Sequence, residues 1–305
     1  MKPLIAIVGP TAVGKSKLAL RLAQDFEGEI ISADSRQVYR YMDIGTAKPT
    51  PEEQSSIPHH LIDLVDPNED FSLALYQDLA CTAISDIHDR HKLPLLVGGS
   101  GLYVWAVLEG WSIPQVPPSA QLRQELQDRA ESEGGDALYR ELEELDPESA
   151  QQIDRRNLRR VIRALEVCHS TGEPFSKLRK KNPLDFDTMT IGLTAERTEL
   201  YRRIDSRVDR MIEQGLVEEV RGLIDRGYSL ALTSMSGVGY REIGRFLSGE
   251  MALPDAVERI KFETHRIARH QYAWFRLKDE RIHWFDSDEE AANRALELTI
   301  KMVLT

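Results

Sequence analysis

The sequence predicts an α/β fold, in which a parallel sheet is flanked by helices and carries an all-helical insertion domain. Two observations support this class. Short apolar runs alternate with segments of helical periodicity, as in βαβ units. A proline-rich stretch at residues 114–118 then interrupts the alternation, and a long helix-patterned region follows before strand patterns return.

The expected strands are the apolar runs at residues 4–8, 30–33, 93–97, 188–193 and 281–285. A helix follows the first strand, with apolar residues at helical spacing (Leu18, Ala19, Leu22 and Phe26). Ser72 is expected to cap another helix, whose buried stripe is Leu75, Leu79, Ala83 and Ile87. A further long helix is expected after Pro254.

The insertion reads as helix over residues 119–172, with breaks at Gly134-Gly135 and Asp146-Pro147. Its last helix has the apolar face Leu158, Val161, Ile162 and Leu165, and Cys168 is expected in the same core. We therefore expect a core formed by residues 1–113 and 187–305, with the helical domain at 114–186 between them.

Composition narrows the class of protein. The chain has 305 residues, 41% of them hydrophobic, and no apolar run reaches the roughly 18 residues of a membrane span. Cys81 and Cys168 match no metal or redox spacing, and free thiols without a signal peptide suggest the cytoplasm. The net charge of −11 opposes nucleic-acid binding overall, but five arginines lie within residues 155–163. A local basic patch therefore keeps that possibility open.

Residues 9–16, GPTAVGKS, match the phosphate-binding pattern G-x-x-x-x-G-K-[ST] in full, between an expected strand and an expected helix. Glycines allow close backbone approach, backbone N–H groups face an anion, and Lys15 adds positive charge. The Ser16 hydroxyl suits Mg²⁺. The motif thus predicts a P-loop-type sheet and a site for a di- or triphosphate-like ligand, made of Gly9, Thr11, Ala12, Val13, Gly14, Lys15 and Ser16. ATP binding is expected only at the level of the motif, which NTPases, kinases and pyrophosphate enzymes share.

Asp34 follows the second expected strand, at the edge of a parallel sheet where ligands bind. Its carboxylate could orient Mg²⁺, accept a proton from a nucleophile, or simply cap a helix. The polar segment DSRQVYRYMDIGTAKP and then PHHLIDLVDP follow it. So many functional groups beside a phosphate loop favour substrate recognition over a packing role.

These motifs together resemble those of the tRNA dimethylallyltransferase family, also called tRNA isopentenyltransferases. The matching segments are GPTAVGKS, ADSRQVYRYMDIGTAKP, PHHLID, LLVGGSGLY, RRVIRALEV and GVGYRE, which occur in order over residues 5–285. The resemblance implies transfer of a dimethylallyl group from dimethylallyl diphosphate to the N6 amine of the adenosine immediately 3′ of a tRNA anticodon. It also implies a Mg²⁺ requirement and pyrophosphate as product. We further expect a monomer.

The resemblance assigns roles to particular residues. It implies that Asp34 is the general base and that Arg207, in RIDSRVDRM, holds the pyrophosphate. This suits the chemistry, because an adenine amine is a poor nucleophile and the leaving anion needs stabilisation. The target base must also leave its stack. The implied tRNA contacts are Asp34, Ser35, Arg36, Gln37, Ser100, Arg123, Arg159, Arg160, Arg163, Gly237, Val238, Gly239, Tyr240, Arg241, Arg269, Gln271, Trp274 and Arg276.

One segment departs from the family pattern. In THRIARHQYAWFRLK, His265 and His270 stand where the family usually has arginines. Phosphate contact there is expected to be weaker and sensitive to pH, since histidine titrates near ~6.5. The aromatic residues interleaved with cations in this segment suit stacking on RNA bases, while some of them also form a core stripe.

Three other functions compete with this interpretation. A small-molecule kinase would share the phosphate loop and the aspartate, but it would carry a short arginine-bearing lid in place of a long helical insertion. An isopentenyltransferase acting on free adenine nucleotides would not need the basic stretches. A non-catalytic RNA-binding protein conflicts with the intact Lys15, Ser16 and Asp34.

Overall fold

The computed structural model describes residues 2–303 apart from 115, 117, 118, 179, 180, 183–185 and 288. Contacts divide the chain into two compact units. The first is Met1–Leu108 together with Asp185–Thr305, and the second is Glu109–Leu184. Within the described ranges, no helix combines the length and the apolar character needed to cross a membrane.

The first unit is built on a parallel sheet in the order β3-β2-β4-β1-β5-β6. The strands are β1 Pro3–Val8, β2 Gly28–Ser32, β3 His59–His60, β4 Leu93–Val97, β5 Asp187–Thr194 and β6 Ile282–Asp286. The five predicted strands are confirmed, each within two residues at its ends. β3 was not predicted, because a two-residue edge strand leaves no periodicity to detect.

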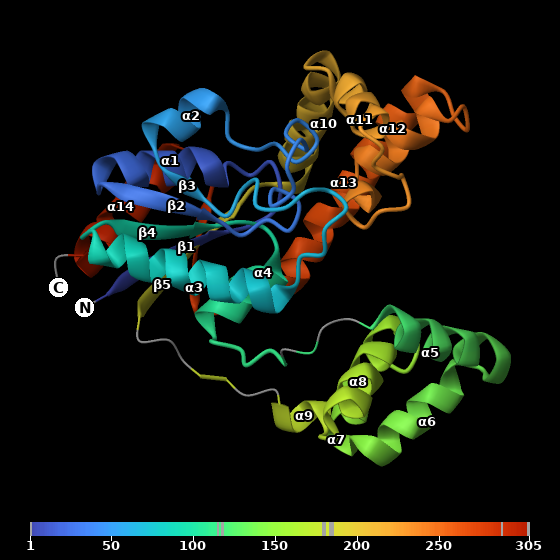
Figure 1. The fold of residues 1–305 in the computed structure, drawn as a ribbon. Helices are drawn as coiled ribbons and strands as arrows, with labels where there is room; N and C mark the ends of the chain where they lie inside the picture. The colour runs from blue at the N-terminus through green and yellow to red at the C-terminus, as the bar shows by residue number, and fades with distance from the viewer. Residues whose placement is uncertain are drawn as a thin grey trace. The chain divides into compact units, whose positions relative to one another are not determined.

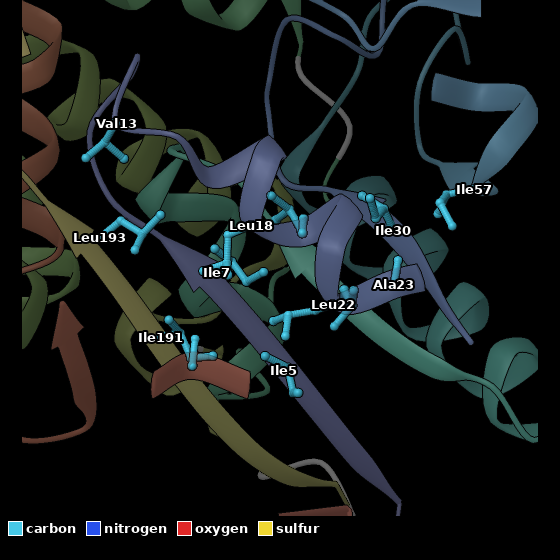
Figure 2. Close-up of a cluster of buried hydrophobic side chains, with 14 of the residues drawn as sticks. Ile5, Ile7, Val13, Leu18, Leu22, Ala23, Ile30, Ile57, Ile191 and Leu193 are labelled. Atoms are coloured by element: carbon cyan, nitrogen blue, oxygen red, sulfur yellow. The ribbon is translucent and has the colours of Figure 1, made fainter. Parts of the chain in front are cut away.

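Helices cover both faces of this sheet (Figure 1). The helices of this unit are α1 Lys15–Asp25, α2 Pro51–Ser56, α3 Leu73–Asp89, α4 Gly101–Leu108, α10 Arg197–Glu213, α11 Leu216–Asp225, α12 Tyr240–Leu247, α13 Leu253–Trp274 and α14 Glu289–Val303, with a 3₁₀ turn, η1, at Ser234–Ser236. Of these, α11 and α12 pack with α13 in a separate buried cluster. Alternate residues of β1 face opposite sides of the sheet. Ile5 and Ile7 pack with Leu18 and Leu22 of α1 in one buried cluster (Figure 2), and α3 covers the other face.

The buried face of α3 differs from the prediction. Leu75 is 41% exposed, whereas Tyr76, Ala80, Ile84 and Ile87 are fully buried. The predicted stripe is therefore wrong by one residue over most of its length. The helix is turned this way because the Tyr76 ring stacks on Tyr103 at 3.9 Å and its hydroxyl donates to the Ser32 carbonyl.

The second unit is helical throughout its regular elements. These are α5 Ala120–Glu133, α6 Gly135–Leu145, α7 Pro147–Gln152, α8 Leu158–Thr171 and α9 Phe175–Leu178. Both predicted breaks are confirmed, since α6 begins at Gly135 and α7 begins at Pro147 after the capping side chain of Asp146. The predicted face of α8 is buried in a separate core with Leu138 and Leu142, and Cys168 is buried as predicted.

Candidate active site

A cavity of about 1120 Å³ lies at the carboxyl edge of the sheet in the first unit. Its walls include residues that directly follow β1, β2 and β4, which are neighbours in the sheet. Parallel strands bring such segments to one edge, where ligands of α/β proteins bind. The cavity therefore lies where the phosphate loop and Asp34 were expected to meet.

The phosphate loop joins β1 to α1 in a conformation that depends on glycine. Gly9 and Gly14 have φ of 138° and 105°, and Ala12 has φ of 63°. A Cβ on Gly9 would lie 2.3 Å from the Leu193 carbonyl oxygen of β5. Thr11, Ala12, Gly14, Lys15 and Ser16 line the cavity, whereas the Val13 side chain is buried in the core. Any contact from Val13 to a ligand must therefore come from its backbone.

Positive charge is concentrated beside this loop. The Lys15 ammonium donates to the carbonyl oxygens of Gly9 and Pro10 at 3.0 and 2.8 Å. Burial, and then the nearby Arg207, lower the pKa of Lys15 to about 7, while Asp34 opposes that shift. Burial likewise lowers the pKa of Arg207, whose guanidinium lies 3.4 Å from the Thr11 hydroxyl. An anion in the cavity would relieve the repulsion between these two cations.

Gln271 of α13 holds the phosphate loop in place. Its side-chain oxygen accepts from the Thr11 N–H at 2.8 Å, and its amide donates to the Gly99 carbonyl at 3.1 Å. The Thr11 N–H, expected to face an anion, is directed instead to this side chain. Gln271 was expected to contact tRNA; that remains a prediction, while its amide here links the segments after β1 and β4.

The GGSG segment lets other parts of the chain approach closely. An added Cβ would lie 2.1 Å from the Ala33 oxygen at Gly98 and 2.2 Å from the Gln271 amide at Gly99. At Gly101 it would lie 2.3 Å from the Trp274 ring. These glycines let α13 lie against the segment after β4, so that Trp274 lines the cavity.

Asp34 directly precedes a turn at residues 35–38, and it lines the cavity. Its Oδ1 accepts from the Arg36 N–H at 2.8 Å. In the part of the chain that the structure describes, no donor contacts its Oδ2. The helix-cap alternative is therefore wrong, because no helix begins here. Ser100 holds the same turn, since its hydroxyl accepts from the Ser35 N–H at 3.2 Å.

The next two residues are used mainly to hold the cavity walls. The Arg36 guanidinium donates to the carbonyl oxygens of Thr233 and Ser234. The Gln37 amide donates to the carbonyl oxygens of Thr46 and Ala47 and accepts from Ser32. Both side chains line the cavity as well, so their predicted contact with a nucleotide stays a prediction.

The segment at the start of α12 forms another wall. Gly237, Val238 and Gly239 line the cavity, and so does Tyr240, whose ring is 1% exposed. Arg241 is directed elsewhere, because its guanidinium pairs with the buried Glu242.

Of the predicted residues on and after α13, some line the cavity and others do not. Trp274 and His270 line the cavity. Arg269 is exposed and donates to the Tyr201 hydroxyl, and Arg276 is exposed beyond the helix end. His265 lies between helices, where it stacks on Tyr201 at 4.0 Å and pairs with Asp205 at 2.8 Å. From the sequence, His265 was expected to contact phosphate. In the structure its contacts are those of helix packing.

In the helical unit, two of the predicted arginines are bound to an internal carboxylate. Arg123 makes two hydrogen bonds of 2.9 Å to Glu166, and Arg163 contacts the same group at 2.5 Å. Glu166 has no exposed surface, and it also accepts from the Ser119 N–H at 2.7 Å. Arg159 and Arg160 are exposed, and among the described residues no carboxylate pairs with either.

Two residues were not predicted from the sequence: Lys48, which lines the cavity, and Glu219, which holds part of its wall. Lys48, with a 3% exposed side chain, donates to the Tyr39 carbonyl and pairs with Asp43 and Asp63. Glu219 accepts hydrogen bonds from the segment that precedes Lys48. The motif containing Lys48 was noted, but Glu219 is an acidic residue on an amphipathic helix and gave no signal.

Comparison with known proteins agrees with this geometry. A model of the IPP transferase family matches residues 37–278, and an isopentenyl transferase model matches residues 2–64. A tRNA dimethylallyltransferase of Roseiflexus castenholzii is 58% identical over 276 residues, covering 90% of each chain. One from Dehalococcoides mccartyi is 50% identical and covers 98% of this chain and 92% of its own.

Solved structures are similar to this chain in the same way, and they come from the same group of enzymes. A full-length tRNA isopentenylpyrophosphate transferase of Bacillus halodurans is 43% identical with a TM-score of 0.72, covering 99% of this chain and 96% of its own. A eukaryotic dimethylallyltransferase, described as acting on tRNA, is 30% identical with a TM-score of 0.83. The match covers 99% of this chain and 80% of that one. The P-loop-type fold is thereby confirmed, and the kinase alternative is excluded. The chain belongs to the tRNA dimethylallyltransferase family of IPP transferases.

Proposed function

We propose that this chain transfers a dimethylallyl group from dimethylallyl diphosphate to the N6 amine of the adenosine immediately 3′ of a tRNA anticodon. The observation that carries the proposal is the single cavity in which Lys15, Arg207 and Asp34 all lie. Two cations suit the diphosphate, and one carboxylate suits the amine. A single chain supplies all of these groups, so we propose a monomer as the active unit, and the cytoplasm as the place where it meets tRNA.

The phosphate loop and Arg207 bind the diphosphate. The Lys15 ammonium exchanges the Gly9 and Pro10 carbonyl oxygens for phosphate oxygens. Arg207 approaches from α10 beside Thr11. As the bond between the allylic carbon and the diphosphate oxygen breaks, negative charge grows on the pyrophosphate, and these fixed cations stabilise it.

Asp34 accepts the proton. The adenosine nitrogen forms its bond to the allylic carbon, and the N–H proton passes to the Asp34 carboxylate. The Arg36 N–H holds Oδ1 and thereby orients the carboxylate, while Oδ2 faces no donor among the described residues. Pyrophosphate leaves, and the products are prenylated adenosine, pyrophosphate and one proton.

The residues present fit a magnesium ion. The Ser16 side chain is exposed at the start of α1, and both it and Asp34 line the cavity. No group of three or more histidine, cysteine or acidic side chains suited to a metal occurs in the described residues. Mg²⁺ commonly takes one or two protein oxygens together with phosphate and water. When bound, the ion would neutralise charge on the diphosphate.

The acceptor is proposed to be tRNA because the relatives are named for it. Exposed arginines on both units, among them Arg159, Arg160 and Arg269, provide charge for its backbone despite the net charge of −11. The free-nucleotide alternative gives these arginines no role.

The experiment incubates the protein with dimethylallyl diphosphate and Mg²⁺ and with either unmodified tRNA or AMP. Nucleosides from the tRNA and the nucleotide pool are then measured by mass spectrometry. We expect dimethylallyl-adenosine in the tRNA alone. Prenylated AMP would replace the proposal with the free-nucleotide enzyme, and no product from either acceptor would overturn it.

A further inference from the structure

The irregular segment after Asp34 contains an unusual carboxylate site. Residues 43–45 form no helix or strand, yet their three consecutive N–H groups all point at Glu219 of α11. Asp43 and Ile44 donate to Oε2 at 2.9 and 2.7 Å, and Gly45 donates to Oε1 at 3.1 Å. Successive N–H groups of this kind form an anion-binding nest, and here the anion belongs to the protein.

Glu219 also receives a fourth hydrogen bond, from the start of α12. The Tyr240 hydroxyl donates to Oε1 at 2.6 Å, and burial raises the pKa of this phenol well above its usual value. The Tyr240 ring lies against Gly45, where an added Cβ would be only 2.6 Å from the ring carbon Cε2. One carboxylate thus joins α11, the 43–45 segment and the beginning of α12.

Both joined segments line the cavity. Gly45 through Pro49 form one part of its wall, and Ser236 through Tyr240 form another. The first part is tied to the Asp34 turn, because the Gln37 amide donates to the Thr46 and Ala47 carbonyl oxygens. The position of this wall relative to the Asp34 carboxylate therefore depends on Glu219, which does not itself line the cavity.

We infer that Glu219 is a positioning residue for the acceptor adenosine. It acts through the 43–45 segment and Tyr240, because Gly45 and Tyr240 line the same cavity as Asp34. The phosphate loop, in contrast, is held by Gln271, and among the described residues no hydrogen bond joins it to this junction. The inference rests on the proposed function, and it predicts that loss of Glu219 affects the acceptor and leaves the diphosphate donor unaffected.

The test is Glu219→Gln. An amide of the same shape presents one oxygen, while its NH₂ group faces donors and loses their hydrogen bonds. We expect the KM for unmodified tRNA to rise about tenfold, and the KM for dimethylallyl diphosphate to stay within about twofold. The matched control is Glu218→Gln, because Glu218 is the exposed neighbour and makes only a 3.8 Å pair with Arg221. It should leave both constants unchanged.

Two further variants keep the test decisive if Glu219→Gln folds poorly. Tyr240→Phe removes the fourth hydrogen bond and keeps the ring, so the KM for tRNA should rise about threefold. Gly45→Ala forces the Tyr240 ring to move and should produce the same selective rise. A merely structural role would lower the thermal midpoint and leave the ratio of the two KM values unchanged.

The outcomes distinguish a failure of the role given to Glu219 from a failure of the proposed function. Wild-type protein that prenylates tRNA, with equal changes in both KM values for the variants, would overturn the role of Glu219 and leave the function intact. Wild-type protein that prenylates no tRNA would overturn the proposed function itself.

Discussion

Arg207 of the first unit and the pair Arg123 and Arg163 of the helical unit are held in opposite ways. In the first unit, Arg207 is half-buried beside Lys15 and the phosphate loop, where the charge of the candidate base Asp34 opposes the lowering of its pKa by burial. In the helical unit, Arg123 and Arg163 share the fully buried Glu166. Both arrangements begin from arginines on amphipathic helices. A buried carboxylate makes an arginine structural, whereas its absence leaves the charge available to a ligand.

The largest expected effect concerns the first unit. Asp34→Asn keeps an oxygen for the Arg36 N–H but cannot accept a proton, so turnover should fall by about 10²–10⁴-fold. Single-turnover mass spectrometry of the tRNA nucleosides measures it. Binding of pyrophosphate and of tRNA should stay within a few-fold, which serves as the control. Turnover near that of the wild type would remove Asp34 from the mechanism.

The next effect concerns stability of the helical unit. Glu166→Ala leaves two guanidinium groups without their shared partner and should cost about 2 kcal/mol, because both retain partial contact with water. Urea denaturation, with hydrogen exchange in α5 and α8, measures it. Glu131→Ala, at an exposed site on α5, should change little. Equal stability of the two variants would show that the Glu166 network is not structural.

A smaller effect separates the arginines within the helical unit. Arg159→Ala with Arg160→Ala should weaken tRNA binding about tenfold and make the slope of log affinity against log salt less steep by about 1.5. Arg123→Ala with Arg163→Ala should change the slope less and lower stability more. Affinities measured at several salt concentrations test this, and identical slopes for the two pairs would contradict the division.

The smallest effect is a pH dependence of the first unit. Lys15 has a pKa of about 7, and a bound diphosphate favours its charged form. Binding therefore takes up a proton, and the contribution of Lys15 to pyrophosphate affinity should fall about tenfold from pH 6 to pH 8. Calorimetry in two buffers measures the uptake. Lys15→Met removes this contribution and leaves only the titration of pyrophosphate; the same pH dependence in both proteins would exclude Lys15 as the source.

The features that could be predicted from the sequence were those set by residues close together along the chain. Continuous apolar runs predicted the strands, and Gly and Pro predicted the breaks at Gly135 and Pro147. The phosphate loop was also predictable, because its backbone conformation needs glycines at fixed positions. Each of these features depends on contacts within a few residues or on a periodicity.

The other features depend on partners distant in the sequence. The orientation of α3 is set by the stacking of Tyr76 on Tyr103, which no helical pattern reveals. Glu219 meets Gly45 across 174 positions, and Gln271 meets Thr11 across 260. His265 illustrates the same limit, because its partner Asp205 lies on another helix and the local pattern suggested a phosphate ligand.

The link between Thr11 and Gln271 has a consequence for synthesis of the protein. A ribosome adds roughly 5–20 residues per second, so the 260 positions between them take on the order of tens of seconds. Throughout that interval the nascent chain carries its phosphate loop without the side chain that fixes it. Gly99 and Gly101 likewise lack their packing partners, Gln271 and Trp274 of α13, until that helix has been synthesised. The anion site is therefore completed only after α13 has been translated, long after its own motif has left the ribosome.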